Sequence, residues 1–281
     1  MKKTVTISIW AILLASLILA SGCKKKSDSS ATGPVPVVVT GNSSNITPTS
    51  VDFTGNITSD GGSFVTKRGF CWSYTNQNPT IVNDKIVFGS GAGSFSGTIT
   101  GLNNQTLYYI RAYAANNNGT GYGSTLAVTT IPFTCGLSYQ GGIIFFIDEV
   151  GDHGLIAATS DQSIGTPWGC VGTLIGGTGI SIGMGQANTT AIVNGCSTAG
   201  IAAQICDALV LNGYSDWFLP SNGEMDQMYL QKAIIGAANE SYWGSTEADA
   251  TSAYAKNFIT GSYNGIHAKS LTFYVRAVRT F

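Results

Sequence analysis

The residues that most often carry catalysis are scarce in this chain. Histidine occurs only at His153 and His267, and each lies in a turn-rich polar stretch where a solvated side chain is the usual outcome. The one G-x-S-x-G pattern, at residues 179–183, lies in a glycine-rich stretch without the strand–turn–helix context of a nucleophile elbow. The chain contains no C-x-x-C pair of the kind that binds zinc. We therefore expect neither an enzyme nor a bound metal or cofactor. The net charge of −1 and the lack of a basic stripe argue against nucleic-acid binding.

Aromatic side chains near polar groups in the last third of the chain could instead bind a sugar. A ring offers a flat apolar face, and neighbouring carboxylates and amides offer hydrogen bonds to hydroxyl groups. The candidate ligand-binding residues are Trp168, Tyr242, Trp243, Glu247, Asp249, Tyr254, Asn257 and Tyr263. A place in the hydrophobic core is the alternative for Trp243.

Disulfide bonds are the second chemistry that the sequence offers. The candidates are Cys135, Cys170, Cys196 and Cys206, and an exported chain would allow them to oxidise. A helix predicted to begin just after Cys196 would hold Cys206 about 12 Å or more away, because a helix rises about 1.5 Å per residue. A disulfide needs Cα atoms within about 7 Å. We therefore expect Cys170 to join Cys196 or Cys206, and Cys135 to take the other. Cys71 is predicted to be a lone thiol.

An aromatic segment around Trp217 runs directly into a predicted helix start. Ser221 and Glu224 have the S-x-x-E spacing of a capping box, in which each side chain accepts the backbone N–H of the other residue. This structural role accounts for the acidic group of Glu224. Arg276 lies in an apolar strand and needs a partner, so we expect it to pair with Asp216 or Glu224. We expect the aromatic segment to be buried, with the C-terminal domain packed around it.

The first 22 residues have the pattern of a signal peptide. Two lysines precede a short apolar run over residues 7–20, and small residues lead to Cys23. This arrangement resembles the bacterial lipobox, which implies lipidation of Cys23 and anchoring to the outer membrane of the cell envelope, with the protein exposed at the surface. Residues 23–34 are too polar to fold and predict a flexible tether. An ordinary secretory signal with an incidental cysteine is the alternative.

The positions of strands and turns divide the rest of the chain into two domains. Residues 35–131 contain seven short runs with strand-like alternation and frequent turn signals, which predicts an all-β sandwich. Leu102, Thr106 and Tyr108 have the spacing of a tyrosine corner, and the segment resembles a fibronectin type III module. Such modules usually act as spacers.

Residues 135–281 predict an α+β domain. Runs at 141–147 and 155–159 read as a hairpin, and three further strands are expected at 241–246, 253–259 and 272–278. A helix is predicted over 199–212 with Thr198 as its cap, and a second helix follows Ser221. The glycine-rich stretch 165–188 has little periodicity and predicts a long structured loop.

Four motifs in this second domain occur in a recognisable order: YQGGIIF at 139–145, NGYSDWFLPS at 212–221, YWGST at 242–246 and VRAVR at 275–279. The segment resembles the Lcl C-terminal domain family, which in turn is similar to the C-type-lectin-like fold shared with formylglycine-generating enzymes. The resemblance implies a surface domain that recognises a glycan or a matrix polymer, as an adhesin does. A structural envelope component that binds another protein is the first alternative, and an enzyme of the formylglycine-generating type is the second.

Overall fold

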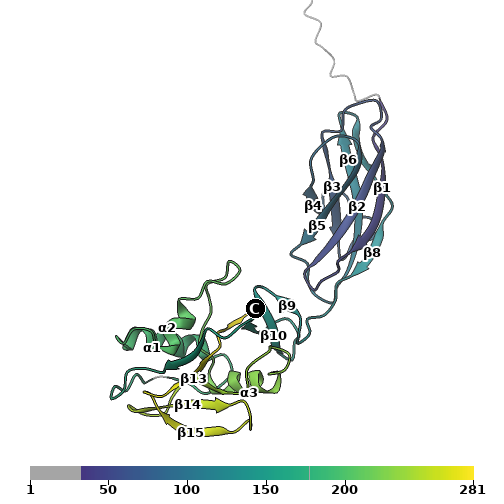
Figure 1. Ribbon diagram of the computed structural model, residues 1–281. Helices are drawn as coiled ribbons and strands as arrows, with labels where there is room; N and C mark the ends of the chain where they lie inside the picture. The colour runs from purple at the N-terminus through teal and green to yellow at the C-terminus, as the bar shows by residue number, and fades with distance from the viewer. Residues whose placement is uncertain (1–32, 177) are drawn as a thin grey trace, which may run out of the picture.

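The first domain is a sandwich of two antiparallel sheets (Figure 1). The computed structural model describes residues 33–176 and 178–281, so the predicted signal peptide and Cys23 lie outside the described residues. The strands are β1 (Val37–Ser44), β2 (Ser50–Ser59), β3 (Lys67–Ser73), β4 (Asp84–Val87), β5 (Gly93–Thr100), β6 (Leu107–Asn116), β7 (Gly119–Tyr122) and β8 (Leu126–Thr129). One sheet has the order β1-β2-β5 and the other β4-β3-β6-β7, with β8 also paired to β6.

Alternation of side chains builds the core of the sandwich. In β2, Val51, Phe53 and Ile57 face inward and are buried, while their neighbours remain at least partly accessible. They meet Phe70 and Ile110 of the opposite sheet in one apolar cluster. The two-residue period of the sequence is therefore the period of the sheet face, as expected for strands with one buried side.

The tyrosine corner forms as predicted. The backbone N–H of Asn103 donates to the hydroxyl oxygen of Tyr108 at 2.9 Å, which fixes the loop that precedes β6. Cys71 is a buried free thiol, also as predicted. One expectation was incomplete, because residues 119–122 form the additional strand β7 where a turn was predicted.

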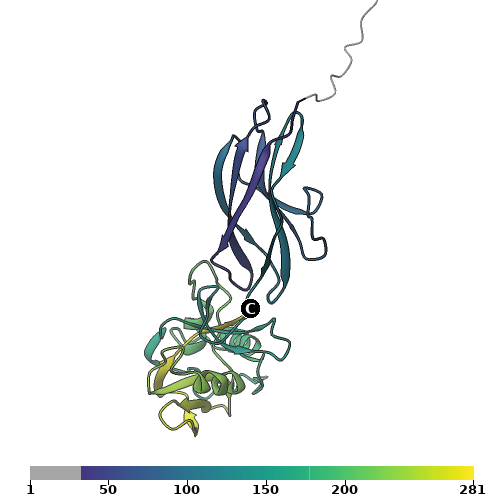
Figure 2. The ribbon, with the colours of Figure 1, turned by 90° about the vertical axis from the view of Figure 1, so that its right-hand side faces the viewer.

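The described part of the second domain, called the head below, contains three helices and two sheets. Figure 2 shows the head at one end of the sandwich. The elements of the head are β9 (Ser138–Tyr139), β10 (Gly142–Ile147), β11 (Gly154–Ala158), β12 (Ser163–Pro167), α1 (Gly185–Gly195), α2 (Ala202–Asp207), α3 (Asn222–Leu230), β13 (Ser241–Glu247), β14 (Ser252–Asn257), β15 (Tyr263–Ala268), β16 (Thr272–Val275) and β17 (Val278–Thr280). The sheets have the orders β17-β11-β10-β9 and β12-β16-β13-β14-β15. No helix in the described part of the chain is both long and apolar enough to cross a membrane.

The aromatic segment before α3 separates two apolar clusters of the head. Trp217 and Leu219 pack into one cluster, and Phe218 between them packs into the other, since alternate residues of an extended segment point to opposite sides. Phe218 also exchanges backbone hydrogen bonds with Val278 at 2.8 and 3.0 Å. The predicted burial of this segment is confirmed.

The other two helices differ from the sequence prediction. Helix α2 spans only six residues and begins after Ile201, without a side-chain cap, so the longer helix capped by Thr198 is wrong. Helix α1 was not predicted, and its first four residues belong to the stretch 165–188 that was predicted to be a loop. Its inner face carries Asn188 and Thr189 beside Ile192. Because this buried face is partly polar, it produces no apolar stripe by which the sequence could reveal the helix.

Candidate functional site

The three largest of the candidate ligand-binding residues lie in the core of the head. Trp168, Tyr242 and Trp243 are no more than 1% exposed. The two indole N–H groups donate to backbone carbonyls, that of Trp168 to Gly244 at 2.9 Å and that of Trp243 to Thr166 at 2.8 Å. The sugar-stacking role predicted for these residues is wrong, because no ring face is open to a ligand.

The smaller candidate residues whose side chains the structure describes do not form a site either. Asp249 is exposed and accepts the backbone N–H and the hydroxyl of Thr251 in a local turn, at 2.7 and 2.8 Å. The side-chain oxygen of Asn257 accepts two backbone N–H groups of the turn that follows β14. Tyr254 is half-buried within β14, and the side chain of Tyr263 lies outside the described residues. These polar groups stabilise turns.

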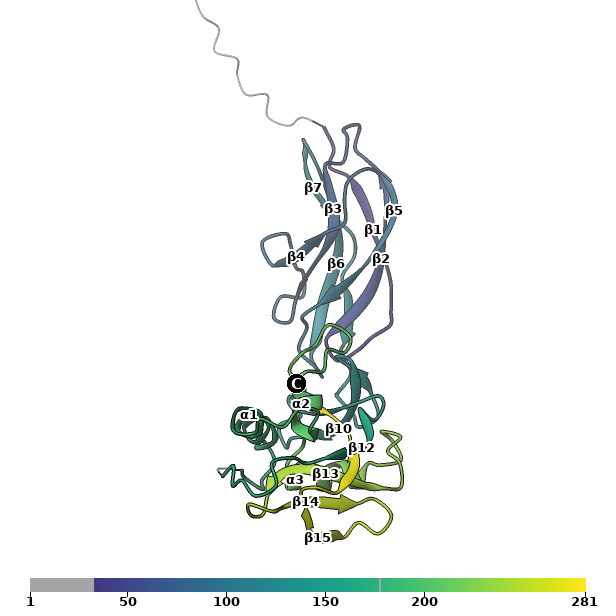
Figure 3. The ribbon, with the colours of Figure 1, turned by 60° about the vertical axis from the view of Figure 1, so that its left-hand side comes forward.

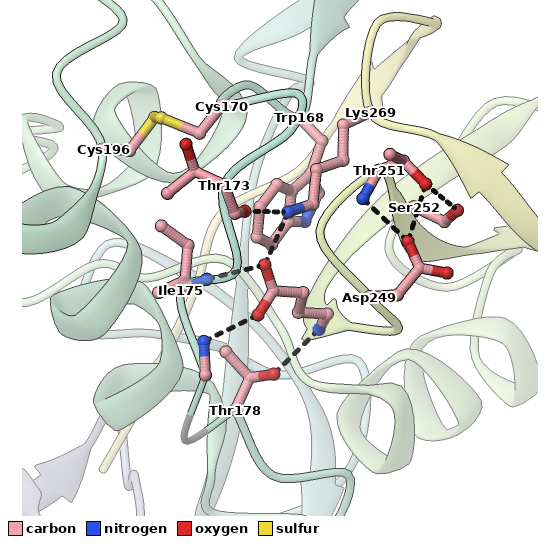
Figure 4. A network of polar contacts seen from close by, with 12 residues as sticks. Trp168, Cys170, Thr173, Ile175, Thr178, Cys196, Asp249, Thr251, Ser252 and Lys269 are labelled. Carbon is pink, nitrogen blue, oxygen red and sulfur yellow. Dashed lines mark hydrogen bonds and ion pairs between the residues drawn. A yellow bond between two sulfur atoms is a disulfide. The ribbon is translucent and has the colours of Figure 1, made fainter.

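Glu247 anchors the glycine-rich loop that precedes α1 (Figure 4). Its two carboxylate oxygens accept the backbone N–H groups of Ile175 at 2.9 Å and Gly176 at 2.7 Å. The ammonium of Lys269, which is fully buried, lies 2.5 Å from Oε1 of Glu247 and 4.6 Å from the ring centre of Trp168. A buried carboxylate with these partners has a structural role, so the predicted ligand contact of Glu247 is wrong.

A disulfide ties the same loop to the end of α1. Cys170 and Cys196 are bonded (Figure 4), which selects one of the pairings left open by the sequence. Cys135 and Cys206 are both free, so the second predicted disulfide is wrong. Cys206 is buried within α2, and desolvation raises the pKa of its thiol far above the usual range. Neither thiol has the low pKa that marks a reactive cysteine.

Glu224 anchors the same loop from its other end. The capping box with Ser221 is complete, with the glutamate accepting the serine N–H at 2.8 Å. The other carboxylate oxygen accepts the N–H groups of Gly183 at 2.9 Å and Gly185 at 3.4 Å. Burial raises the pKa of Glu224, and these bonds act in the opposite direction. The structural role predicted for Ser221 and Glu224 is thus extended to the loop.

Arg276 has a different partner from those predicted. Its Nε donates to Oδ1 of Asp161 at 2.6 Å, and its Nη1 donates to the carbonyl of Ala158 at 2.9 Å. Asp216 instead accepts two hydrogen bonds from Arg279, at 2.7 and 2.8 Å. The predicted pairing of Arg276 with Asp216 or Glu224 is wrong, although the need for a partner was correctly predicted. Sequence reasoning missed Asp161 and Arg279 as partners.

One opening in the described structure lies between the two domains. It is a cleft of about 650 Å³. The sandwich contributes the loop that carries Asn103 and Asn104, and the head contributes Tyr139, Asp152 and His153. The C-terminal end of the chain lies on the side of the head that faces the sandwich (Figure 3). Of the predicted ligand-binding residues whose side chains the structure describes, none lines this cleft.

A direct hydrogen bond joins the two walls of the cleft. The side-chain amide of Asn104 donates to the carbonyl of Gly151 at 2.8 Å. Each loop is also fixed within its own domain. The hydroxyl of Thr130 donates to the carbonyl of Asn103 at 2.6 Å, and the N–H of Gly151 donates to Asp148 at 2.8 Å. The cleft is therefore bounded by ordered backbone on both sides.

Comparison with solved structures gives partial, low-scoring matches, among them fibronectin type III domains. No protein-family model matches the chain, and the comparison with curated proteins gives no match. A fibronectin type III domain of human collagen XX is 19% identical over 35% of this chain and 94% of that chain, with a TM-score of 0.26. The sensor domain of the anti-sigma factor RsgI4 from Pseudobacteroides cellulosolvens is 17% identical over 35% of this chain and 96% of that chain, with a TM-score of 0.27.

A multidomain fragment of titin is 22% identical over 35% of this chain, with a TM-score of 0.28. The matched part spans 33% of that fragment. At these scores the likeness carries no argument about function. The two sheets and the tyrosine corner described above independently show that the first domain is a β-sandwich.

Proposed function

We propose that this protein is a lipoprotein of the cell surface, anchored through Cys23, whose head binds a glycan or an extracellular matrix polymer. The proposal takes the head as a relative of the Lcl C-terminal domain with a C-type-lectin-like fold, on the strength of the four sequence motifs. It is supported most by the arrangement of the two domains. The described chain begins at the end of the sandwich opposite the head (Figure 1). A lipid at Cys23 would therefore leave the head as the outermost part.

The architecture of the head suits exposure outside the cell. A disulfide and buried ion pairs hold its long loops in place. Disulfides persist in oxidising compartments. The sandwich acts as a spacer between the anchor and the head in this proposal.

Two measurements on cells that express the full chain test the proposal. Metabolic labelling with a fatty acid should mark the wild type but not Cys23→Ala, and surface protease should release the head from intact cells. Cells bearing the wild type should adhere to an immobilised glycan or matrix panel, and cells bearing Cys23→Ala should not. Labelled and surface-exposed protein that adheres to no polymer would contradict the binding role. Capture of a single envelope protein instead would favour the structural alternative.

A further inference from the structure

The cleft between the domains has the size and the lining of a ligand site. Its volume of about 650 Å³ falls within the range of roughly 300–1,000 Å³ typical of small-molecule sites. Sites of this kind combine aromatic and apolar surface with a few convergent polar groups. Both components are present here.

Three aromatic rings form a continuous apolar surface at the cleft. Phe133, Tyr139 and Phe281 line it and pack against one another, with ring centroids 4.9 to 5.4 Å apart. All three side chains are half-buried, so they keep accessible surface while the head core supports them from behind. Rings held in this way lose little conformational entropy when a ligand stacks on them.

Polar groups from both domains surround these rings. The side chains of Asn103 and Asp152 hydrogen-bond to no other described residue and line the cleft from opposite walls. Gln140 accepts a bond from Arg279 through Oε1 at 2.6 Å, which orients its amide nitrogen as a remaining donor. His153 is 74% exposed and adds a ring nitrogen. A planar amide opposite a carboxylate provides donors and acceptors for several adjacent hydroxyl groups.

The charge of the lining restricts the class of ligand. Among the described residues that line the cleft there is no lysine or arginine, and Asp152 contributes a negative charge. An acidic glycan would enter without a cation to pair with it, at a desolvation cost. A neutral saccharide has the apolar C–H faces and the hydroxyl groups that this lining matches.

We propose that the interdomain cleft binds a neutral oligosaccharide, whose rings stack on Phe133, Tyr139 and Phe281 and whose hydroxyls bond to Asn103 and Asp152. This inference rests on the proposed glycan-binding function and adds the site and the ligand class. It also gives the sandwich a second role, because Asn103 belongs to the sandwich. The ligand would then be bound by both domains at once.

Calorimetric titration of the full mature chain with a panel of neutral and acidic oligosaccharides tests the proposal. We expect a neutral oligosaccharide to bind and acidic ones to bind more weakly. Asn103→Ala and Asp152→Ala should each weaken that binding about 3- to 10-fold, which is the loss expected for one hydrogen bond. The matched control is Phe64→Ala, an exposed aromatic of the sandwich that does not line the cleft. It should leave the affinity unchanged.

The possible failures are distinguishable. Wild-type binding that is unaffected by both wall variants would overturn the cleft as the site and leave glycan binding elsewhere intact. No binding of any glycan by the wild type would overturn this inference together with the proposed function. Preference for acidic oligosaccharides, or displacement of the sugar by an unstructured peptide, would overturn the neutral-sugar class. Since Asn103 and Asp152 make no internal side-chain bonds, unchanged melting temperatures should accompany both variants.

Discussion

The sandwich and the head bury different kinds of side chain. In the sandwich, the interior is an apolar cluster drawn from both sheets. In the head, charged groups are buried beside the apolar clusters, namely Glu224, Glu247, Lys256, Lys269, Arg276 and Arg279. Every buried charge found in the described part of the chain lies in the head. The difference follows from the loops, because a long irregular segment leaves backbone groups that only polar side chains can satisfy.

The two modes of stabilisation respond differently to mutation. Apolar burial is non-directional and spread over many contacts, so the loss of one polar group in the sandwich has a limited effect. A buried ion pair fails as a unit, because removing one partner leaves the other charged and desolvated. The following changes, ordered from the largest expected effect to the smallest, test this contrast.

Glu247→Gln should cause the largest loss of stability. The amide keeps the shape but leaves the Lys269 ammonium buried without its counter-charge, and breaking a buried pair in this way costs about 3–5 kcal/mol. Denaturant unfolding should show this loss in the head. Asp249→Asn, two residues away and exposed, is the matched control and should change stability by less than about 0.5 kcal/mol. Equal effects of the two variants would contradict the anchoring role of Glu247.

Loss of the Cys170–Cys196 disulfide should have the next largest effect. The bond spans a sequence separation of 26 residues, and cross-links of that size stabilise by about 3 kcal/mol. Cys196→Ala should therefore lower the melting temperature of the head and leave that of the sandwich unchanged. Cys135→Ala is the control, since Cys135 is half-buried and free. If thiol counting on the unfolded protein detected Cys135 and Cys206 as oxidised, the assigned connectivity would be wrong.

The capping box of the head and the tyrosine corner of the sandwich can be compared directly, and the expected losses of stability are smaller. Ser221→Ala should destabilise the head by about 1 kcal/mol through loss of the capping box. Tyr108→Phe should destabilise the sandwich by a similar amount, about 1 kcal/mol, through loss of its bond to Asn103. Chemical denaturation of each variant measures both losses. A much larger loss for Tyr108→Phe would show that the sandwich also depends on a polar anchor.

The smallest expected effect depends on pH. The hydrogen bonds from Arg279 hold the pKa of Asp216 below its usual value of 3.8. A carboxyl group whose pKa is lower in the folded state stabilises the fold at pH values above its unfolded-state pKa. This contribution disappears as the pH falls through the folded-state pKa. The melting temperature of the wild type should be slightly higher than that of Asp216→Asn at pH 7. The difference should shrink as the pH falls below 3.8 and through the lowered folded-state pKa. The effect is small because the Asp216 side chain is 53% exposed. A difference that grows in acid would contradict this sign.

The sequence correctly predicted contacts between residues that are close together in the chain. It did not predict the partners of residues that are far apart in the chain. The capping box of Ser221 and Glu224 and the corner of Tyr108 depend on residues three to five positions apart, so their patterns predicted the contacts correctly. Arg276 was predicted to need a partner, but that partner is Asp161, 115 residues away. Several acidic residues could have met it, and only the packed fold selects one.

The same limit explains the errors at the predicted ligand site. Trp243 carries an indole N–H that could face a sugar or a backbone carbonyl, and sequence cannot distinguish these outcomes. The fold satisfies this group internally through Thr166. The cleft lining was missed for a different reason. Asn103 and Asp152 belong to different domains, and no pattern within either domain brings them together.

Hydrogen exchange with and without a bound neutral oligosaccharide tests most directly whether the two domains form one site. Saturation of the full mature chain should slow amide exchange in both walls of the cleft, over residues 102–106 of the sandwich and 139–153 of the head. The loop anchored by Glu247 should exchange at an unchanged rate. Slower exchange in the head alone, or around the buried Trp243, would contradict a site shared by the sandwich and the head.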